Sequence, residues 1–111
     1  MDDKFFKKST KDVKEVKAME GIFRKTMVYN EKMMMVRFKL LKDADLPMHS
    51  HPHDQMGFVI SGKLEFIANG KSKILVTGDS YLVKGNIEHG AKVLEDCIVL
   101  DIFVPAREDY M

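Results

Sequence analysis

The stretch HSHPHDQMGFVISG, residues 49–62, decides how the chain is interpreted. It spaces two histidines and a glutamine as His49, His51 and Gln55, and a further histidine, His89, follows later in the chain. Alternate residues of a β-strand point to the same side, roughly 7 Å apart, so His49 and His51 could grip one ion together. The chain has four histidines and one glutamine, and four of these five residues lie on the pattern. The spacing therefore predicts a site for a single metal ion.

The composition describes one small domain with no bias toward a charged partner. The chain has 111 residues, enough for a single apolar core, and a formal net charge of +1. It therefore lacks the excess of positive charge that would attract nucleic acid or anionic lipid. The longest apolar run, residues 97–104, is too short to span a membrane, and the N-terminus shows no signal segment. We expect a cytoplasmic protein whose lone cysteine, Cys97, is a buried, inert thiol.

The pattern from residue 21 onward is that of β-strands. Leu46-Pro47 is expected to end the second of them, and Asn69-Gly70 predicts a tight hairpin because both residues tolerate positive φ. Apolar-rich runs bounded by turn residues predict strands at 22–29, 33–41, 56–60, 64–68, 74–76, 81–83, 91–94 and 97–104. The order of short strands predicts an all-β sandwich or small barrel over residues 13–111, after a polar tail or short helix at 1–12.

Two apolar clusters need separate interpretation. Thioethers suit soft metals, but the consecutive residues Met33, Met34 and Met35 would alternate between the two faces of a strand, which favours core packing. Phe5-Phe6 interrupts the polar N-terminal segment and could dock on the body or on a second subunit. Unpaired sheet edges also invite association, so we predict a homodimer.

The motifs resemble those of the cupin superfamily over about residues 21–111. The first cupin motif appears as His49, His51, Gln55 and Gly62, and the second as Gly78 and His89. The resemblance implies a jelly-roll barrel that binds one divalent transition metal, Mn, Fe, Ni or Zn, through His49, His51, Gln55 and His89. The sequence departs from the pattern at turn positions, where Asp43 and Asn86 replace glycines, Lys84 replaces a proline and Val93 replaces an asparagine.

Two local strings resemble the small cupins of the pectin-degradation type, which act on unsaturated uronates. They are HSHPHDQMG at 49–57 and DIFVPAREDY at 101–110. In those proteins a glutamine is a metal ligand, and an Asp, a Phe and an Arg spaced like Asp101, Phe103 and Arg107 belong to the active site. The resemblance therefore implies that a small sugar acid is the substrate.

The residue types refine this prediction. Neutral Gln55 leaves the ion its full charge, which favours Lewis-acid chemistry over redox chemistry, although it could also be a tolerated isostere of glutamate. Asp101 lies in a strand that is apolar on both faces, so it must be paired, protonated or facing a wet cavity. It is a candidate general acid or base, or else the partner of Arg107 in a structural ion pair. Tyr81 and Phe103 could line the pocket or belong to the core. His53 is expected to face solvent or to support a ligand.

The preferred hypothesis is a metal-dependent enzyme that linearises 4,5-unsaturated uronates, as an isomerase or lyase would. Asp101 would move the proton and the fork of Arg107 would hold the substrate carboxylate, unless Arg107 is a surface residue beside Glu108 and Asp109. Two alternatives stay open, an iron-dependent dioxygenase and a non-catalytic module that binds a metal or a sugar acid.

Overall fold

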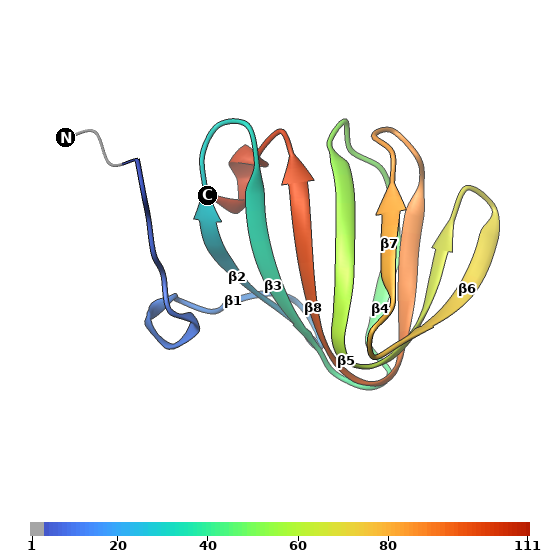
Figure 1. Cartoon of the computed structure of the whole chain (residues 1–111). Coiled ribbons are helices and arrows are strands. Elements are labelled where there is room, and N and C mark those ends of the chain that lie inside the picture. The colour runs from blue at the N-terminus through green and yellow to red at the C-terminus, as the bar shows by residue number, and fades with distance from the viewer. Residues whose placement is uncertain (1–3) are drawn as a thin grey trace.

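The computed structural model describes residues 4–111, so residues 1–3 of the predicted tail lie outside the described residues. The described part is built from strands and two short 3-10 helices, η1 (Thr10–Asp12) and η2 (Glu108–Tyr110), as Figure 1 shows. The strands are β1 (Val16–Met19), β2 (Ile22–Tyr29), β3 (Met34–Leu40), β4 (Asp45–His49), β5 (Asp54–Ala68), β6 (Lys71–Val76), β7 (Ser80–Val83) and β8 (His89–Val104).

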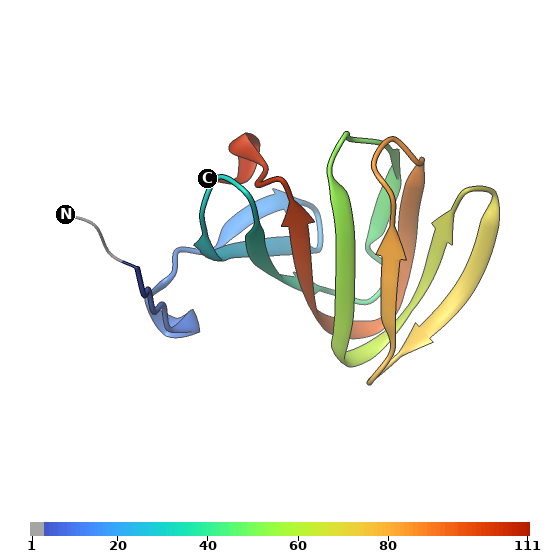
Figure 2. The same ribbon diagram turned by 45° about the horizontal axis from the view of Figure 1, so that its top comes forward.

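Two long strands organise the fold. β5 and β8 pair antiparallel along almost their whole length and bend together at the base of the molecule (Figures 1 and 2). The first half of β5 pairs with β7 and its second half with β6, whereas β8 pairs first with β4 and then with β3. Each long strand therefore belongs to both sheets of a jelly roll. β2 and β1 extend the sheet beyond β3.

A bulge in β5 produces the bend. The pairing register with β8 shifts between Val59 and Leu64, and Gly62 within this segment has φ of 105°. A Cβ at Gly62 would lie 2.7 Å from the Cα of Cys97, so both the backbone angle and the close approach require glycine. The motif glycine thus sets the angle between the two sheets.

The core lies between the sheets. On β8 the side chains of Cys97, Val99, Asp101 and Phe103 point inward, a direction that the sequence left open because both faces of this strand are apolar. The largest buried cluster consists of Ile22, Ala44, Val59, Leu64, Phe66, Leu75, Val83, Ala91, Val93, Cys97 and Val99. Burial raises the pKa of the Cys97 thiol, which keeps it protonated at neutral pH.

Several predicted strand limits are wrong. Residues 56–60 and 64–68 belong to the one strand β5, and 91–94 and 97–104 belong to the one strand β8, because bulges bend these strands without ending them. β1 and β4 are additional strands that the sequence interpretation missed. Pro47 does not stop a strand, since it lies inside β4, which pairs on one side only and so tolerates a missing N–H.

The turns explain why the departures from the cupin pattern are tolerated. Asp43 and Asn86 stand where glycines are expected, and they have φ of 73° and 68°. Asp and Asn enter this left-handed region at lower cost than other residues with a Cβ, so the turns survive. The Asn69-Gly70 hairpin between β5 and β6 is confirmed, with positive φ at both residues.

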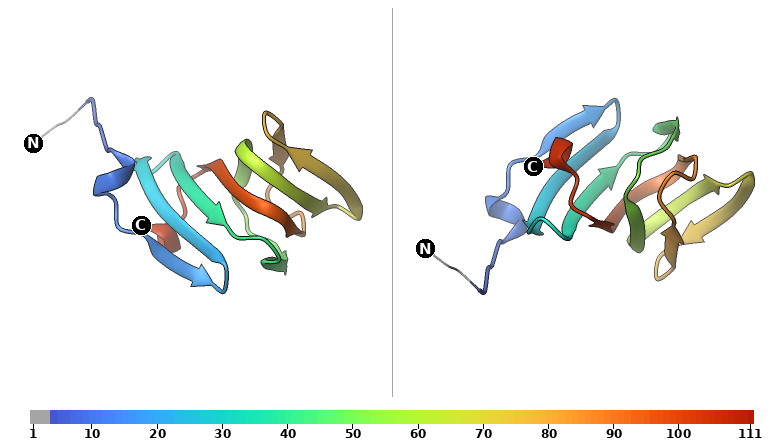
Figure 3. Two further views of the ribbon diagram at one scale, coloured as in Figure 1. Left: turned by 90° about the horizontal axis from the view of Figure 1, so that it is seen from below. Right: turned by 90° about the horizontal axis from the view of Figure 1, so that it is seen from above.

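The N-terminal segment runs away from the barrel, as the two views of Figure 3 show. Phe5 is 92% exposed, while Phe6 lines a shallow apolar pocket with Met33 and Met35. Met33 is exposed and Met34 buried, so the methionine run does alternate between faces. Among residues 4–111 there is no helix with the length and apolar character needed to cross a bilayer.

Candidate metal centre

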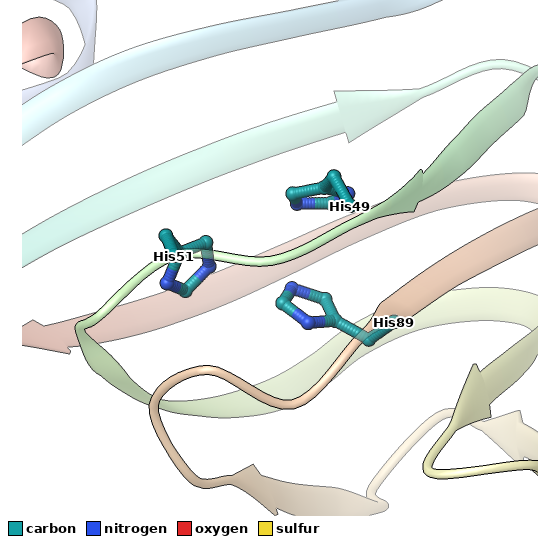
Figure 4. Close-up of side chains that lie close together, drawn as sticks. All are labelled: His49, His51 and His89. Atoms are coloured by element: carbon teal, nitrogen blue, oxygen red, sulfur yellow. The ribbon is translucent and has the colours of Figure 1, made fainter.

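Three imidazoles converge at one end of the barrel (Figure 4). His49 ends β4 and His89 begins β8, and these two residues are paired in register. His51 lies in the loop that follows β4, so the loop and not strand alternation brings it to the others. One ring nitrogen from each histidine lies within 4.8 Å of those from the other two. The structure thus brings together the three predicted histidines.

Main-chain carbonyls fix the tautomer of each imidazole. The Nδ1 atoms of His49, His51 and His89 lie 2.9, 3.1 and 2.9 Å from the carbonyl oxygens of Pro47, His53 and Ile87. Because a carbonyl can only accept, each Nδ1 carries the proton and each Nε2 presents a lone pair. Histidines that bind metals are arranged in this way: one ring nitrogen faces the ion, and the N–H of the other, here Nδ1, donates a hydrogen bond.

Gln55 completes the donor set. It is buried near the start of β5, and its Nε2 donates to Oδ2 of Asp101 at 3.0 Å, which turns Oε1 toward His51. Oε1 of Gln55 and Nε2 of His51 are 3.1 Å apart. Both atoms offer lone pairs, so their approach is repulsive unless a cation lies between them. About 3 Å is also the separation of two adjacent ligands that each lie about 2.1 Å from one ion.

His89 gives a second indication that a cation belongs here. Its side chain is 1% exposed, and its Nε2 has no hydrogen-bond partner among residues 4–111. A buried polar atom without a partner is costly and needs an explanation. A metal ion bound by His49, His51, Gln55 and His89 would satisfy this atom and the facing lone pairs together. These four residues therefore fit the single metal ion that the sequence pattern predicts.

The environment keeps the imidazoles of His51 and His89 neutral, as metal ligands must be. The pKa of His51 is lowered to about 4, chiefly by burial and next by the positive charge of Arg107. Burial is also the main cause of the lowered pKa of His89. Protons therefore compete weakly for both nitrogens at neutral pH.

Asp101 lies directly behind this donor set. It is 4% exposed, and its two oxygens accept hydrogen bonds from Tyr81 Oη and Gln55 Nε2. The pKa of the Asp101 carboxyl is raised to about 7, because the effect of burial outweighs the two hydrogen bonds, which lower the pKa. Gly57 leaves the space for this pair, since a Cβ there would overlap both Asp101 and the ring of Tyr81.

A small cavity in the barrel connects Asp101 to the apolar core. Its volume is about 50 Å³, and its lining includes Gln55, Tyr81, Asp101, Phe38 and Ile22. This is room for a few water molecules. A sugar acid would therefore have to bind at the mouth, where His49 is partly exposed.

The C-terminal segment covers one side of the mouth. Arg107 does not pair with Asp101, because its fork holds Asp109, with Nη2 3.0 Å from Oδ2. Its guanidinium also lies over the rings of Tyr110 and Phe103, at 3.9 and 5.2 Å from their centroids. Arg107 is thus neither the structural partner of Asp101 nor a loose surface residue.

The remaining predicted residues surround the same centre. Phe103 packs edge-on against His51, with ring centroids 5.8 Å apart, so it belongs to both core and site. The main-chain carbonyl oxygen of His53 lies 3.1 Å from Nδ1 of His51, whereas the Nδ1 atom of His53 itself is buried without a hydrogen-bond partner among residues 4–111. The sequence interpretation missed Arg24 and Tyr110. The signal for Arg24 was available, because it shares the strand parity of buried Ile22.

Fold and site together define a small jelly-roll protein with donors for one metal ion. The sequence profile of the cupin domain matches residues 36–103, so the chain belongs to the cupin family. It is 36% identical over 94 residues to the pectin degradation protein KdgF of Dickeya dadantii (strain 3937), covering 83% of this chain and 86% of that protein.

Two solved structures are closely similar. An RmlC-like cupin from Shewanella frigidimarina NCIMB 400 has a TM-score of 0.91 and 30% identity, over 95% of each chain. KdgF from Halomonas sp. also has a TM-score of 0.91 and 30% identity, over 96% of this chain and 99% of that one. The predicted resemblance to small cupins of the pectin-degradation type is confirmed.

Proposed function

We propose that the protein is a metal-dependent enzyme that linearises 4,5-unsaturated uronates. The observation that carries the proposal is the juxtaposition of four uncharged donors with a buried carboxyl, since Gln55 contacts both His51 and Asp101. The 36% identity to a protein of pectin degradation supports the substrate class.

The proposed cofactor is one divalent transition metal, Mn, Fe, Ni or Zn, held by His49, His51, Gln55 and His89. When bound, it supplies Lewis-acid polarisation of a hydroxyl or carbonyl group. The donors carry no charge of their own, so they leave the ion its full positive charge for this task. A carboxylate ligand, which an oxygen-activating iron centre typically has, is absent from this set.

Asp101 is the proposed proton carrier. Linearisation is an isomerisation: the hemiacetal hydroxyl loses a proton as the C1–O5 bond breaks, and C4 gains one as the C5 enol becomes a ketone. A single carboxyl can accept the first proton and deliver the second, so no other reactant is needed. Tyr81 and Gln55 hold Asp101 in place beside the donors, one through each oxygen.

Three further residues shape the proposed substrate site. Phe103 presents an apolar surface beside His51, and Tyr81 closes the wall behind Asp101. Arg107 adds positive charge to the mouth, although its fork is shared with Asp109. These contacts suit a compact anionic sugar derivative.

The test combines elemental analysis with an ultraviolet assay. The purified protein should contain about one transition metal ion per chain and should abolish the absorbance of the conjugated double bond of unsaturated galacturonate. Removal of the ion by a chelator should stop the reaction, and its return should restore it. Binding of the uronate without conversion would refute the enzyme and support a binding module. Oxygen uptake with conversion of a phenol or diketone would instead indicate the dioxygenase.

We also propose a homodimer formed through the outer face of the sheet. Met35, Ile102, Met56 and Leu82 are paired in register across four strands and point away from the core. Met56 and Leu82 are 51% and 66% exposed, and Phe6 lies at the end of this row. Light scattering should give twice the chain mass.

The proposed compartment is the cytoplasm. The single cysteine, Cys97, is buried and free, so the fold uses no disulfide of the kind that oxidising compartments favour.

A further inference from the structure

We propose that Arg24 binds the substrate carboxylate at the mouth of the barrel. The inference rests on the proposed function, because it names the residue that receives the acid group of a uronate. It also changes the expectation for Arg107, whose fork is already occupied by Asp109.

Arg24 lies on the inner face of β2. It shares strand parity with Ile22, which lines the cavity behind the donors, and with Thr26, whose Oγ1 donates to the carbonyl of Tyr110. Across the sheet it is in register with Phe38, another residue of the cavity wall. Arg24 therefore lies on the same face of β2 as the cavity wall, between the cavity and the C-terminal segment that covers the mouth.

Two guanidiniums meet at one aromatic ring. The central carbon of Arg24 is 4.4 Å from the centroid of Tyr110, and that of Arg107 is 3.9 Å from the same centroid. Asp109 compensates the charge of Arg107, but no ion pair or side-chain hydrogen bond involves Arg24 within residues 4–111. A second, uncompensated cation beside the first favours an incoming anion.

The shape of the Arg24 guanidinium favours a carboxylate as its ligand. A guanidinium presents its N–H donors in a planar fork that matches the two oxygens of a carboxylate, and Tyr110 supports the plane of that fork. A partly buried guanidinium also keeps more of this interaction than a fully solvated one would.

The aromatic side chains connect Arg24 to the donor cluster. Tyr110 packs edge-on against Phe103 at 5.6 Å, and Phe103 packs against His51 at 5.8 Å. Phe103 and Tyr110 thus form a continuous aromatic surface between His51 and Arg24. Arg107 lies over both rings and Arg24 lies at the Tyr110 end, so the surface combines apolar ring faces with two cations, a combination that suits an anionic sugar derivative.

The matched pair Arg24→Gln and Lys25→Gln tests the proposal. Both variants remove one positive charge from the same strand, but Lys25 is partly exposed on the other face, where its Nζ donates to the carbonyl of Thr10. We expect Arg24→Gln to raise KM for unsaturated galacturonate about 10- to 100-fold with little change in kcat, the size of a lost charge-assisted hydrogen bond. Lys25→Gln should leave KM unchanged, and Arg24→Lys should recover part of the loss.

A binding experiment separates carboxylate recognition from mere support of Tyr110. D-galacturonate and its methyl ester should be titrated calorimetrically into the wild type and into Arg24→Gln, with metal content and melting temperature recorded for both. We expect the variant to lose affinity for the acid and to keep its affinity for the ester. An equal loss for both ligands, or an equal KM in Arg24→Gln and Lys25→Gln, would overturn the proposal. If the wild type neither binds nor converts uronates, the proposed function itself fails, whatever the variants do.

Discussion

Replacing Asp101 by asparagine separates proton transfer from structure. Asparagine has the same shape, and its oxygen can accept from Gln55 as Oδ2 does in the wild type. Its amide nitrogen would then face Tyr81, whose hydroxyl can accept as well as donate. Gln55 would keep its orientation toward His51, so the donor cluster and the fold are expected to persist.

The expected loss is at least about 100-fold in kcat, because a positioned acid or base typically contributes about 10²- to 10⁴-fold. A hundredfold loss corresponds to about 2.7 kcal/mol in the activation barrier. Asparagine cannot take up and release a proton, whereas the carboxyl of Asp101, buried beside the donors, can do both. Stability should change little, since the variant keeps both hydrogen bonds and removes a buried ionisable group.

The assay follows the ultraviolet absorbance of unsaturated galacturonate, with metal content measured on the same sample. A variant with a full complement of metal, a native melting temperature and the wild-type rate would show that Asp101 is not the proton carrier. Loss of metal in Asp101→Asn would instead show that the Gln55 contact is needed to hold the donor set, and the rate would then say nothing about proton transfer.

Three further predictions concern the centre and the outer face. His51→Ala should lower metal affinity more than the roughly 10- to 100-fold typical of supporting residues, while His53→Ala should retain the ion; equal metal content in both would refute the ligand role of His51. Gly57→Ala should cost about 1–3 kcal/mol in denaturant unfolding and reduce turnover, because the added methyl group overlaps Asp101; wild-type stability would contradict this crowding. Leu82→Lys should shift the mass in light scattering from dimer to monomer, and an unchanged mass would exclude this face.

The fold could be predicted from local signals where these are strong. Asn69-Gly70 forms the expected hairpin, and the lone cysteine, Cys97, is buried as predicted. The continuous strands β5 and β8 could not be inferred, because their bulges interrupt the pattern of alternation although the pairing goes on. Pro47 misled the interpretation, since only the finished sheet shows that β4 pairs on one side.

For the candidate site, the sequence indicated the residues but not their arrangement. The spacing of His49, His51 and His89 predicts a cluster, yet His51 reaches it from a loop and not from a strand. The carbonyls that fix the imidazoles cannot be read from residue types, because every residue carries one. The pairing of Arg107 with Asp109, in place of Asp101, also depends on where the C-terminal turn folds back.

The position of His49 has a consequence for how an ion would come and go. Its strand, β4, is hydrogen-bonded to β8 alone, whereas the strands that carry Gln55 and His89 lie in the middle of the sheet. Edge strands fray at lower free energy than central ones, so His49 can swing outward while the other donors stay in place. Ion exchange would then follow transient peeling of one short strand, and amide protons of β4 should be replaced by deuterium sooner than those of β5 and β8.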